Sequence, residues 1–270
     1  MSNLRNECIS EFFGTGLFLF FGTSCLSAIK VAGASYGLWE ICIVWGLGIS
    51  LAVYLTAGVS GAHLNPAVTV GLWLFASFPK HKVIPYSLAQ TGGAFFGAMM
   101  CYLIYHDLFT AYEATNAMVR GSEESLYLAS IFSTYPHPEI SVFQAGFVEI
   151  VITATLMSLI LALTDDGNGV PRGALAPLLI GILVAVIGAA TAPLTGFAMN
   201  PARDFGPKLF TFLAGWGNVS LTGAREIPYF LVPIIAPLIG ACVGGFGYKF
   251  FISKGLETEV QPPKEAEEQA

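Results

Sequence analysis

The sequence predicts an all-α membrane protein, built from six transmembrane helices and two half-helices that meet mid-membrane, as two inverted three-helix repeats. Three observations lead to this prediction. Of the 270 residues, 54% are hydrophobic and only 11% are charged, whereas soluble domains carry about 25% charged residues. Six apolar stretches are long enough to cross a bilayer, which takes about 20 residues. Two shorter apolar stretches begin with the same tripeptide, Asn-Pro-Ala.

The expected full spans lie near residues 8–29, 39–58, 84–106, 143–164, 174–194 and 229–252. The stretches 65–78 and 200–213 are too short, because a helix of that length reaches only about 20 Å at 1.5 Å per residue. We therefore predict two half-helices that end inside the membrane.

Three landmarks recur in the same order: Asn65-Pro66-Ala67 and Asn200-Pro201-Ala202, Glu11 and Glu149, and the pairs Gly93/Gly97 and Gly240/Gly244. Their offsets are 135 (200 − 65), 138 (149 − 11) and 147 (240 − 93) residues. Each copy holds three full spans, so the second copy is inverted and both tripeptides fall near the bilayer midplane. We interpret the glycine pairs as sites of close helix packing, since small residues let helix backbones approach each other in lipid.

The tripeptides predict two sharp helix starts, because Asn is a good N-cap and Pro is favoured at the first helical position. The loops before them are irregular, and irregular backbone at membrane depth must be buried or line a wet cavity. We therefore predict a pore lined by the loop carbonyls, with two Asn amides at mid-depth. The carbonyls belong to Gly61, Ala62, His63, Leu64, Gly196, Phe197, Ala198 and Met199.

Charged residues within membrane segments are costly and mark functional sites, and we single out three of those in the predicted segments. Arg203, one turn into the second half-helix, is interpreted as a barrier in the pathway; the alternative is a structural ion pair with Asp204. Glu11 and Glu149 are interpreted as supports that accept hydrogen bonds from the two loops. The alternative for them is a proton relay.

No nucleophile–base spacing, metal cluster or phosphate loop is visible, so we predict no enzyme, no cofactor and no metal site. The five cysteines show no metal-ligand spacing. A net charge of −6 excludes a nucleic-acid partner.

At these residues the sequence resembles the major intrinsic protein (aquaporin) family, and most closely its bacterial glycerol facilitator branch. The resemblance covers roughly residues 7–252. It rests on the run from Ser60 to Thr69 (SGAHLNPAVT), the run from Gly196 to Asp204 (GFAMNPARD), and the run from Asp165 to Gly173 (DDGNGVPRG), which is typical of that branch.

The resemblance implies a selectivity filter at Trp45, Gly188, Phe197 and Arg203. Water-selective members typically have Phe and His where this chain has Trp45 and Gly188, so this filter is expected to be wider and more apolar. Five further positions are of the glycerol type: Tyr135, Asp204, Lys208, Pro233 and Ile234.

The expected function is a channel for passive diffusion of glycerol and similar small neutral solutes, with some water, that excludes ions and protons. A strict water channel and a secondary transporter are the alternatives. We expect one channel domain over residues 1–255 (repeats at about 7–106 and 142–252) and a disordered cytoplasmic tail over 256–270. The Lys/Arg bias of the short loops predicts cytoplasmic termini. The resemblance implies a homotetramer in the lipid bilayer of a bacterial inner membrane.

Overall fold

The computed structural model describes residues 3–168 and 173–259, and within them every regular element is a helix. Six helices are long and apolar enough to cross a membrane. They are α1 (Leu4–Lys30), α2 (Leu38–Ser60), α4 (Val83–Thr115), α6 (Val142–Thr164), α7 (Ala176–Thr195) and α10 (Leu231–Gly247). Two short helices, α3 (Pro66–Phe75) and α8 (Pro201–Thr211), are the predicted half-helices. The predicted fold class is confirmed.

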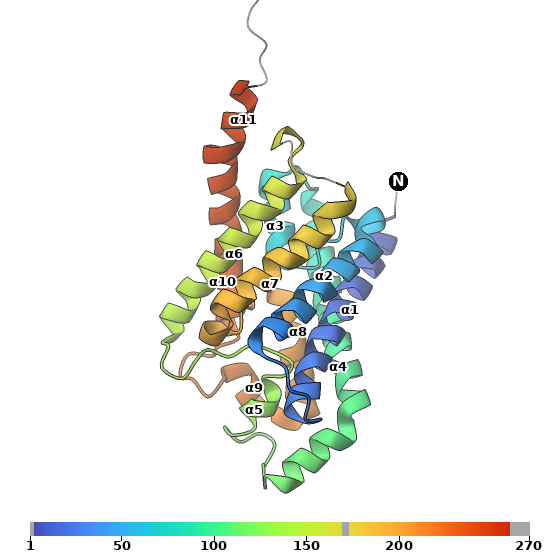
Figure 1. Cartoon of the computed structure of the whole chain (residues 1–270), viewed down its shortest axis with the longest axis vertical. Coiled ribbons are helices and arrows are strands. Elements are labelled where there is room, and N and C mark those ends of the chain that lie inside the picture. The colour runs from blue at the N-terminus through green and yellow to red at the C-terminus, as the bar shows by residue number, and fades with distance from the viewer. Residues whose placement is uncertain (1–2, 169–172, 260–270) are drawn as a thin grey trace, which may run out of the picture.

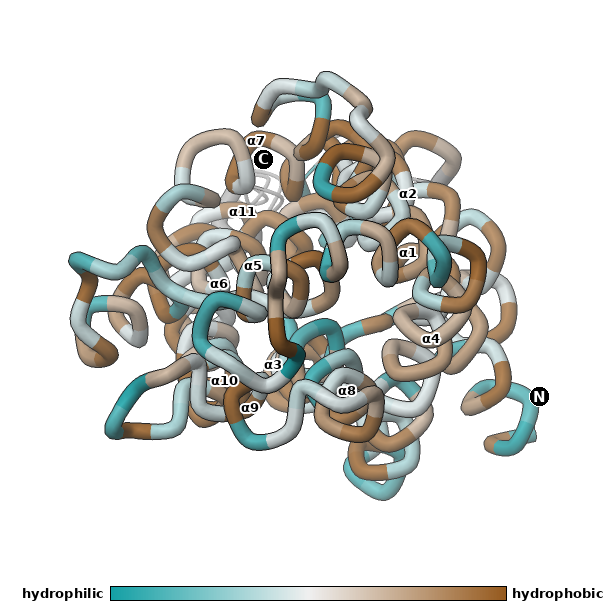
Figure 2. Tube along the Cα trace, turned by 90° about the horizontal axis from the view of Figure 1, so that it is seen from below, coloured by the Kyte–Doolittle hydropathy of each residue, from teal (hydrophilic) through white to brown (hydrophobic). Residues whose placement is uncertain are grey.

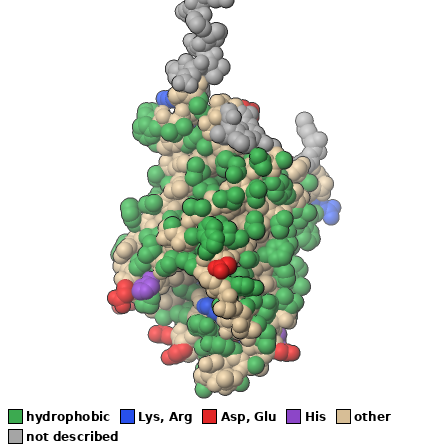
Figure 3. Space-filling model, in the orientation of Figure 1, with side chains coloured by type: hydrophobic (Ala, Val, Ile, Leu, Met, Phe, Trp, Pro, Cys, Tyr) green, Lys and Arg blue, Asp and Glu red, His purple; other side chains and the backbone are tan. Residues whose placement is uncertain are grey.

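The long helices and the two half-helices pack side by side in one bundle (Figures 1 and 2). Neighbouring helices follow one another around the bundle in the order α1, α2, α7, α6 and α10. The half-helices α3 and α8 lie between α10 and α4, and α4 packs against α1. The pair α1–α4 in the first repeat corresponds to α6–α10 in the second. Figure 3 shows hydrophobic side chains over much of one outer face, as expected of a surface that contacts lipid.

Both glycine pairs lie where two helices cross at close range. A Cβ on Gly97 would lie 2.4 Å from the carbonyl oxygen of Gly16, and one on Gly244 would lie 2.0 Å from that of Ala154. The contacted residues are 138 positions apart (154 − 16), the offset that also relates Glu11 to Glu149. The packing interpretation of these glycines is confirmed, and it shows the same crossing in both repeats.

The end of the molecule opposite the chain termini carries structure that the hydropathy pattern did not predict. Helix α4 continues to Thr115, beyond the expected limit at 106, because Phe109 packs with Phe132 and Trp216. Arg120 holds this extension through paired hydrogen bonds to the carboxylate of Glu113. Further short helices here are α5 (Leu126–Ala129), a π-helical turn (Phe212–Trp216) and α9 (Asn218–Thr222).

The N-terminus and the end of the last helix lie at the same end of the bundle (Figure 1). After α10 the chain forms a π-helical stretch (Tyr248–Ser253) and α11 (Lys254–Glu259); the rest of the expected tail, 260–270, lies outside the described residues. Short 3₁₀ turns occur at Lys80–Lys82, Asp166–Asn168 and Gly173–Leu175. The branch-typical run is described up to Asn168; there the backbone amide of Gly167 holds the pKa of Asp165 below its usual value.

Candidate functional site: two half-helix tips and an outer constriction

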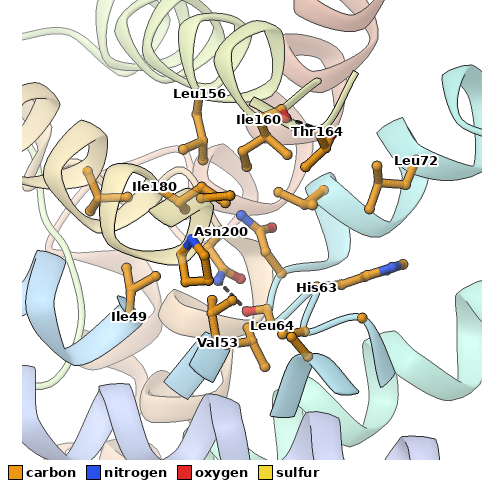
Figure 4. Close-up of a pocket in the computed structure, with 18 of the residues that line it drawn as sticks. Ile49, Val53, His63, Leu64, Leu72, Leu156, Ile160, Thr164, Ile180 and Asn200 are labelled. Atoms are coloured by element: carbon orange, nitrogen blue, oxygen red, sulfur yellow. Dashed lines mark hydrogen bonds between the residues drawn. The ribbon is translucent and has the colours of Figure 1, made fainter. Parts of the chain in front are cut away.

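The two half-helices meet at their N-terminal tips. The side-chain Nδ2 of Asn65 donates to the carbonyl oxygen of Met199 at 2.9 Å. Nδ2 of Asn200 donates to that of Leu64 at 2.8 Å (Figure 4). Each amide carries two N–H groups, and among the described residues each Nδ2 has only this one acceptor. Both asparagines line a cavity, so one N–H of each can meet a solute there.

The same two side chains also cap their own helices. Oδ1 of Asn65 accepts from the backbone N–H of Ala67, and Oδ1 of Asn200 accepts from those of Ala202 and Arg203. Pro66 and Pro201 occupy the first helical position, where no intrahelical N–H bond is lost. Each Asn thus orients its own helix and fixes the opposite loop with one side chain.

The loops before the tips have matching backbone conformations. Left-handed φ values occur at Gly61 (84°), Ala62 (51°) and Leu64 (52°) in the first loop. They recur at Gly196 (76°), Phe197 (43°) and Met199 (51°) in the second loop, each 135 positions later. Non-glycine residues adopt this region at a cost of about 1–3 kcal/mol each, and such strain persists only where the surroundings enforce it.

Glu11, which lies on α1, holds the backbone of the first loop in this conformation. Its carboxylate is fully buried and accepts from the backbone N–H groups of His63 (2.9 Å) and Leu64 (2.7 Å). It also accepts from the hydroxyl of Ser60 (2.6 Å) and from Nε2 of Gln90 (2.7 Å). Four donors thus surround one buried carboxylate, which holds the loop against α1 and α4.

Glu149 makes the corresponding contacts from α6. It accepts from the backbone N–H groups of Ala198 (2.9 Å) and Met199 (2.8 Å) and from the hydroxyl of Thr195 (2.7 Å). Each donor is the repeat counterpart of one at Glu11. The fourth donor has no counterpart here, because the position that matches Gln90 at the 147-residue offset is Pro237.

Trp45, Phe197 and Arg203 come together from α2, the second loop and α8. The rings of Trp45 and Phe197 lie edge to face with centroids 6.4 Å apart. The guanidinium carbon of Arg203 lies 4.3 Å from the centre of the Trp45 ring, a cation–π contact. Arg203 also donates to the carbonyl oxygen of Phe132 at 3.4 Å.

Gly188 on α7, the fourth predicted filter residue, lies against the same group, and its missing side chain does not simply leave an open corner. A Cβ at Gly188 would lie 2.9 Å from the Phe197 ring and 3.0 Å from Sγ of Cys42. The aromatic ring therefore rests directly on the Gly188 backbone. This detail adds to the sequence-based expectation, which took the glycine only as a source of width.

Asp204 is not the partner of Arg203. Its carboxylate accepts from the ammonium of Lys208 (2.5 Å) and from the backbone N–H and hydroxyl of Thr134 (both 2.7 Å). Lys208 donates further to the carbonyl oxygen of Thr134 and lies over the ring of Tyr135. Among the described residues Arg203 makes no ion pair, and the Asp204–Lys208 pair instead ties α8 to the outer loop.

A cavity of about 500 Å³ extends from the tips to the end of the bundle where α1 begins and α11 lies. Its lining includes Val53, Ala62, Val68 and Ile180. At the 135-residue offset these are the repeat counterparts of Gly188, Phe197, Arg203 and Trp45. Figure 4 shows the aliphatic side chains around Asn200, while the ring of His63 points away from it. The four positions that correspond to Trp45, Gly188, Phe197 and Arg203 are therefore all aliphatic in this half of the site.

Several contacts were not foreseen from the sequence. Ser60 and Thr195 could have been found, because both carry a hydroxyl and stand 135 positions apart. Gln90 and Thr134 could not, since they reach the site from distant parts of the chain and no short motif marks them. All candidate site residues lie within the described part of the chain.

Known proteins are similar to this chain in sequence and in fold. The family model described as "Major intrinsic protein" matches residues 1–248. The propanediol uptake facilitator of Citrobacter freundii is 71% identical over 254 residues, 94% of each chain. The glycerol uptake facilitator protein of Escherichia coli K12 is 62% identical over 266 residues, 98% of this chain and 95% of the relative. The X-ray structure of the aquaglyceroporin from Plasmodium falciparum superposes with a TM-score of 0.83 at 29% identity, covering 95% of this chain and 100% of that one.

Proposed function

Because the chain belongs to the major intrinsic protein family, we propose that it is a membrane channel through which glycerol, short diols and some water diffuse passively. The proposal rests first on the joined half-helix tips, where Asn65 and Asn200 each keep one N–H for a passing hydroxyl. The protein is a multi-pass membrane protein and not an enzyme. The names of its relatives support glycerol as a solute.

The pathway pairs polar and apolar surfaces along its length. Loop carbonyls from Gly61 to Leu64 supply hydrogen-bond acceptors, and side chains such as Val53 and Ile180 supply apolar wall to the same cavity. The carbonyls of Leu64 and Met199 already accept one Asn amide each, so each offers one remaining lone pair. A linear solute with hydroxyls along one edge and carbon along the other suits such a wall.

Propanediol is a second candidate solute. Two propanediol uptake facilitators are 71% and 70% identical to this chain, whereas glycerol uptake facilitators from Shigella flexneri and Haemophilus influenzae are 62% and 63% identical. Propanediol replaces one polyol hydroxyl by hydrogen and thereby gains apolar surface. The wall of the inner cavity is uncharged and largely aliphatic. A solute with one hydroxyl fewer therefore has one group fewer that needs a hydrogen-bond partner in this cavity.

Selectivity is assigned to Trp45, Gly188, Phe197 and Arg203. The two rings provide apolar surface, and Arg203 provides donors and a fixed positive charge. That charge, together with the positive ends of two half-helices pointing at mid-depth, disfavours cations and protons. Glu11 and Glu149 are assigned to loop support, since loop donors occupy both carboxylates.

Assembly and orientation complete the proposal. We infer a homotetramer in a bacterial inner membrane, with both termini in the cytoplasm. Both ends of the described chain lie at one end of the bundle, and the Lys/Arg bias of the loops puts that end inside. The aliphatic cavity then opens to the cytoplasm and the constriction lies on the outer side.

Stopped-flow light scattering on proteoliposomes tests the function. Water, glycerol, 1,2-propanediol and urea are applied in turn, with protein-free liposomes as the control. We expect glycerol and propanediol to equilibrate much faster than in the control vesicles. Rapid water flux without glycerol or propanediol flux would instead identify a strict water channel.

A further inference from the structure

We infer that Gly22 on α1, which is not one of the four filter positions, determines solute specificity by providing the surface against which Trp45 rests. This inference rests on the proposed function, because it concerns the width of the same pathway. Gly22 is buried in the middle of α1. It faces α2 at the point where α2 carries Trp45.

The contact between Gly22 and Trp45 leaves no room for a side chain. A Cβ on Gly22 would lie 2.4 Å from Cε2, 2.5 Å from Cδ2 and 2.5 Å from Cζ2 of the indole. Carbon atoms in contact normally lie about 3.5–4.0 Å apart. A methyl group at Gly22 therefore requires the indole to move by about 1 Å or more, since the ring is rigid and cannot bend away.

The direction of that movement follows from the other neighbours of the indole. Phe18 also lies on α1, with its ring centroid 6.4 Å from that of Trp45. The indole's other aromatic contact is Phe197 and its cation–π contact is the guanidinium of Arg203, both among the filter positions. A ring displaced from α1 moves toward these residues and narrows the passage between them.

The inner half of the pathway has a different pair of residues at the corresponding places. The counterpart of Gly22, at the 138-residue offset of α1 and α6, is Ile160. The counterpart of Trp45 is Ile180, and both isoleucines line the inner cavity. The inner pair therefore consists of two aliphatic side chains of equal size, whereas the outer pair consists of a glycine and an indole. Only a glycine leaves space for the indole at that place.

Gly22→Ala tests the inference, with water and glycerol permeabilities measured on the same proteoliposomes. Narrowing affects the wider solute more, so we expect the glycerol-to-water ratio to fall about tenfold, which corresponds to about 1.4 kcal/mol on the solute's barrier. The ratio is independent of how much protein is reconstituted. An unchanged ratio, or an equal fall in both permeabilities, overturns the inference.

Two further variants separate filter width from general packing damage. Gly16→Ala places a methyl on the same helix, 3.0 Å from the carbonyl oxygen of Gly93 and facing α4; it should leave the ratio unchanged. Trp45→Ala removes the indole that the methyl would strike. In the Trp45→Ala background, Gly22→Ala should therefore no longer lower the ratio, and a tenfold fall there overturns the inference.

The unmodified protein distinguishes this inference from the function on which it rests. If it conducts glycerol and Gly22→Ala keeps the same ratio, only the role of Gly22 is overturned. If the unmodified protein conducts neither glycerol nor propanediol, the proposed function fails, and the inference fails with it.

Discussion

At the scale of single residues, each half-helix tip depends on one asparagine whose side chain makes two different contacts. Oδ1 of Asn65 and of Asn200 caps its own helix, and Nδ2 crosses to the opposite loop. Neither Asp nor Ser reproduces both contacts, because Asp lacks the N–H donor and Ser is too short to reach the other loop. The asparagine side chain is required by geometry at both positions.

Replacing both asparagines by alanine should destabilise the protein and lower its conduction together. Each lost cap costs about 1 kcal/mol, and each lost cross-loop bond leaves a buried carbonyl without its donor. We expect a lower melting temperature in detergent for each single variant and a larger fall for the pair. Normal yield, stability and glycerol flux in Asn65→Ala/Asn200→Ala would contradict the assignment.

Arg203→Ala should weaken the exclusion of cations and protons while leaving a conducting protein. The guanidinium is the charge at the constriction, and it rests on Trp45 without a carboxylate partner in the described structure. Proton entry into dye-loaded proteoliposomes under an imposed potential measures the change. Selectivity equal to that of the unmodified protein would count against a barrier role for this residue.

Gly188→His with Trp45→Phe should reduce glycerol flux and leave water flux unchanged. The two substitutions introduce the residues that water-selective members of the family typically have at these positions. The structure adds a cost to this variant, because the imidazole would occupy the place of the Phe197 ring. We therefore expect a lower melting temperature as well. If the variant conducts glycerol as fast as the unmodified protein, the assignment of the constriction to these positions is wrong.

Lys208→Met should be strongly destabilising, although the residue does not touch the pathway. Lys208 and Asp204 are fully buried, and removing one partner of a buried ion pair costs about 3–5 kcal/mol. The control is Lys249→Met, since Lys249 is exposed. Similar melting temperatures for the two variants would show that the pair does not hold the outer loop.

At the scale of elements, the two repeats share their supports as well as their tips. Glu11 and Glu149 receive corresponding donors from the two loops, and the α1–α4 and α6–α10 crossings use glycines at corresponding places.

Gly244→Val should force α6 and α10 apart and sharply reduce the yield of folded protein. Gly247→Val is its control, because nothing lies within 4 Å of a Cβ there; equal yields would contradict the packing argument.

The elements that the sequence predicts well are those marked by local patterns. Asn65-Pro66-Ala67 and its copy define two helix starts by capping alone, and the repeat places them face to face. The resting place of the Phe197 ring on Gly188 depends on side-chain packing across three elements, which no local pattern encodes. Likewise, Thr134 is 70 positions from Asp204 (204 − 134), so their contact needs the folded chain.

The extension of α4 to Thr115 shows a further limit. Hydropathy marks where a helix leaves the membrane, and here the apolar run ends near Asp107. The helix itself continues because Phe109 and Glu113 find partners in the outer loops. Span prediction therefore placed the start of this helix within one residue and missed its continuation beyond residue 106.

At the scale of the whole molecule, the protein is a passive channel rather than a secondary transporter. A secondary transporter needs a group that binds a coupling ion and a rearrangement that exposes it alternately to each side. Among the described residues, all four buried carboxylates have partners. Loop donors occupy Glu11 and Glu149, Lys208 pairs with Asp204, and Lys82 and Tyr86 bond Glu7. A fixed scaffold with joined tips suits diffusion down a gradient.

The most direct test measures labelled glycerol inside proteoliposomes under an imposed pH gradient and, separately, a sodium gradient. If the tips form a passive conduit, the internal concentration rises to the external value and stops there, with either gradient or neither. The entry rate should be unaffected by the gradients. Accumulation of glycerol above the external concentration, driven by protons or sodium, would contradict the account.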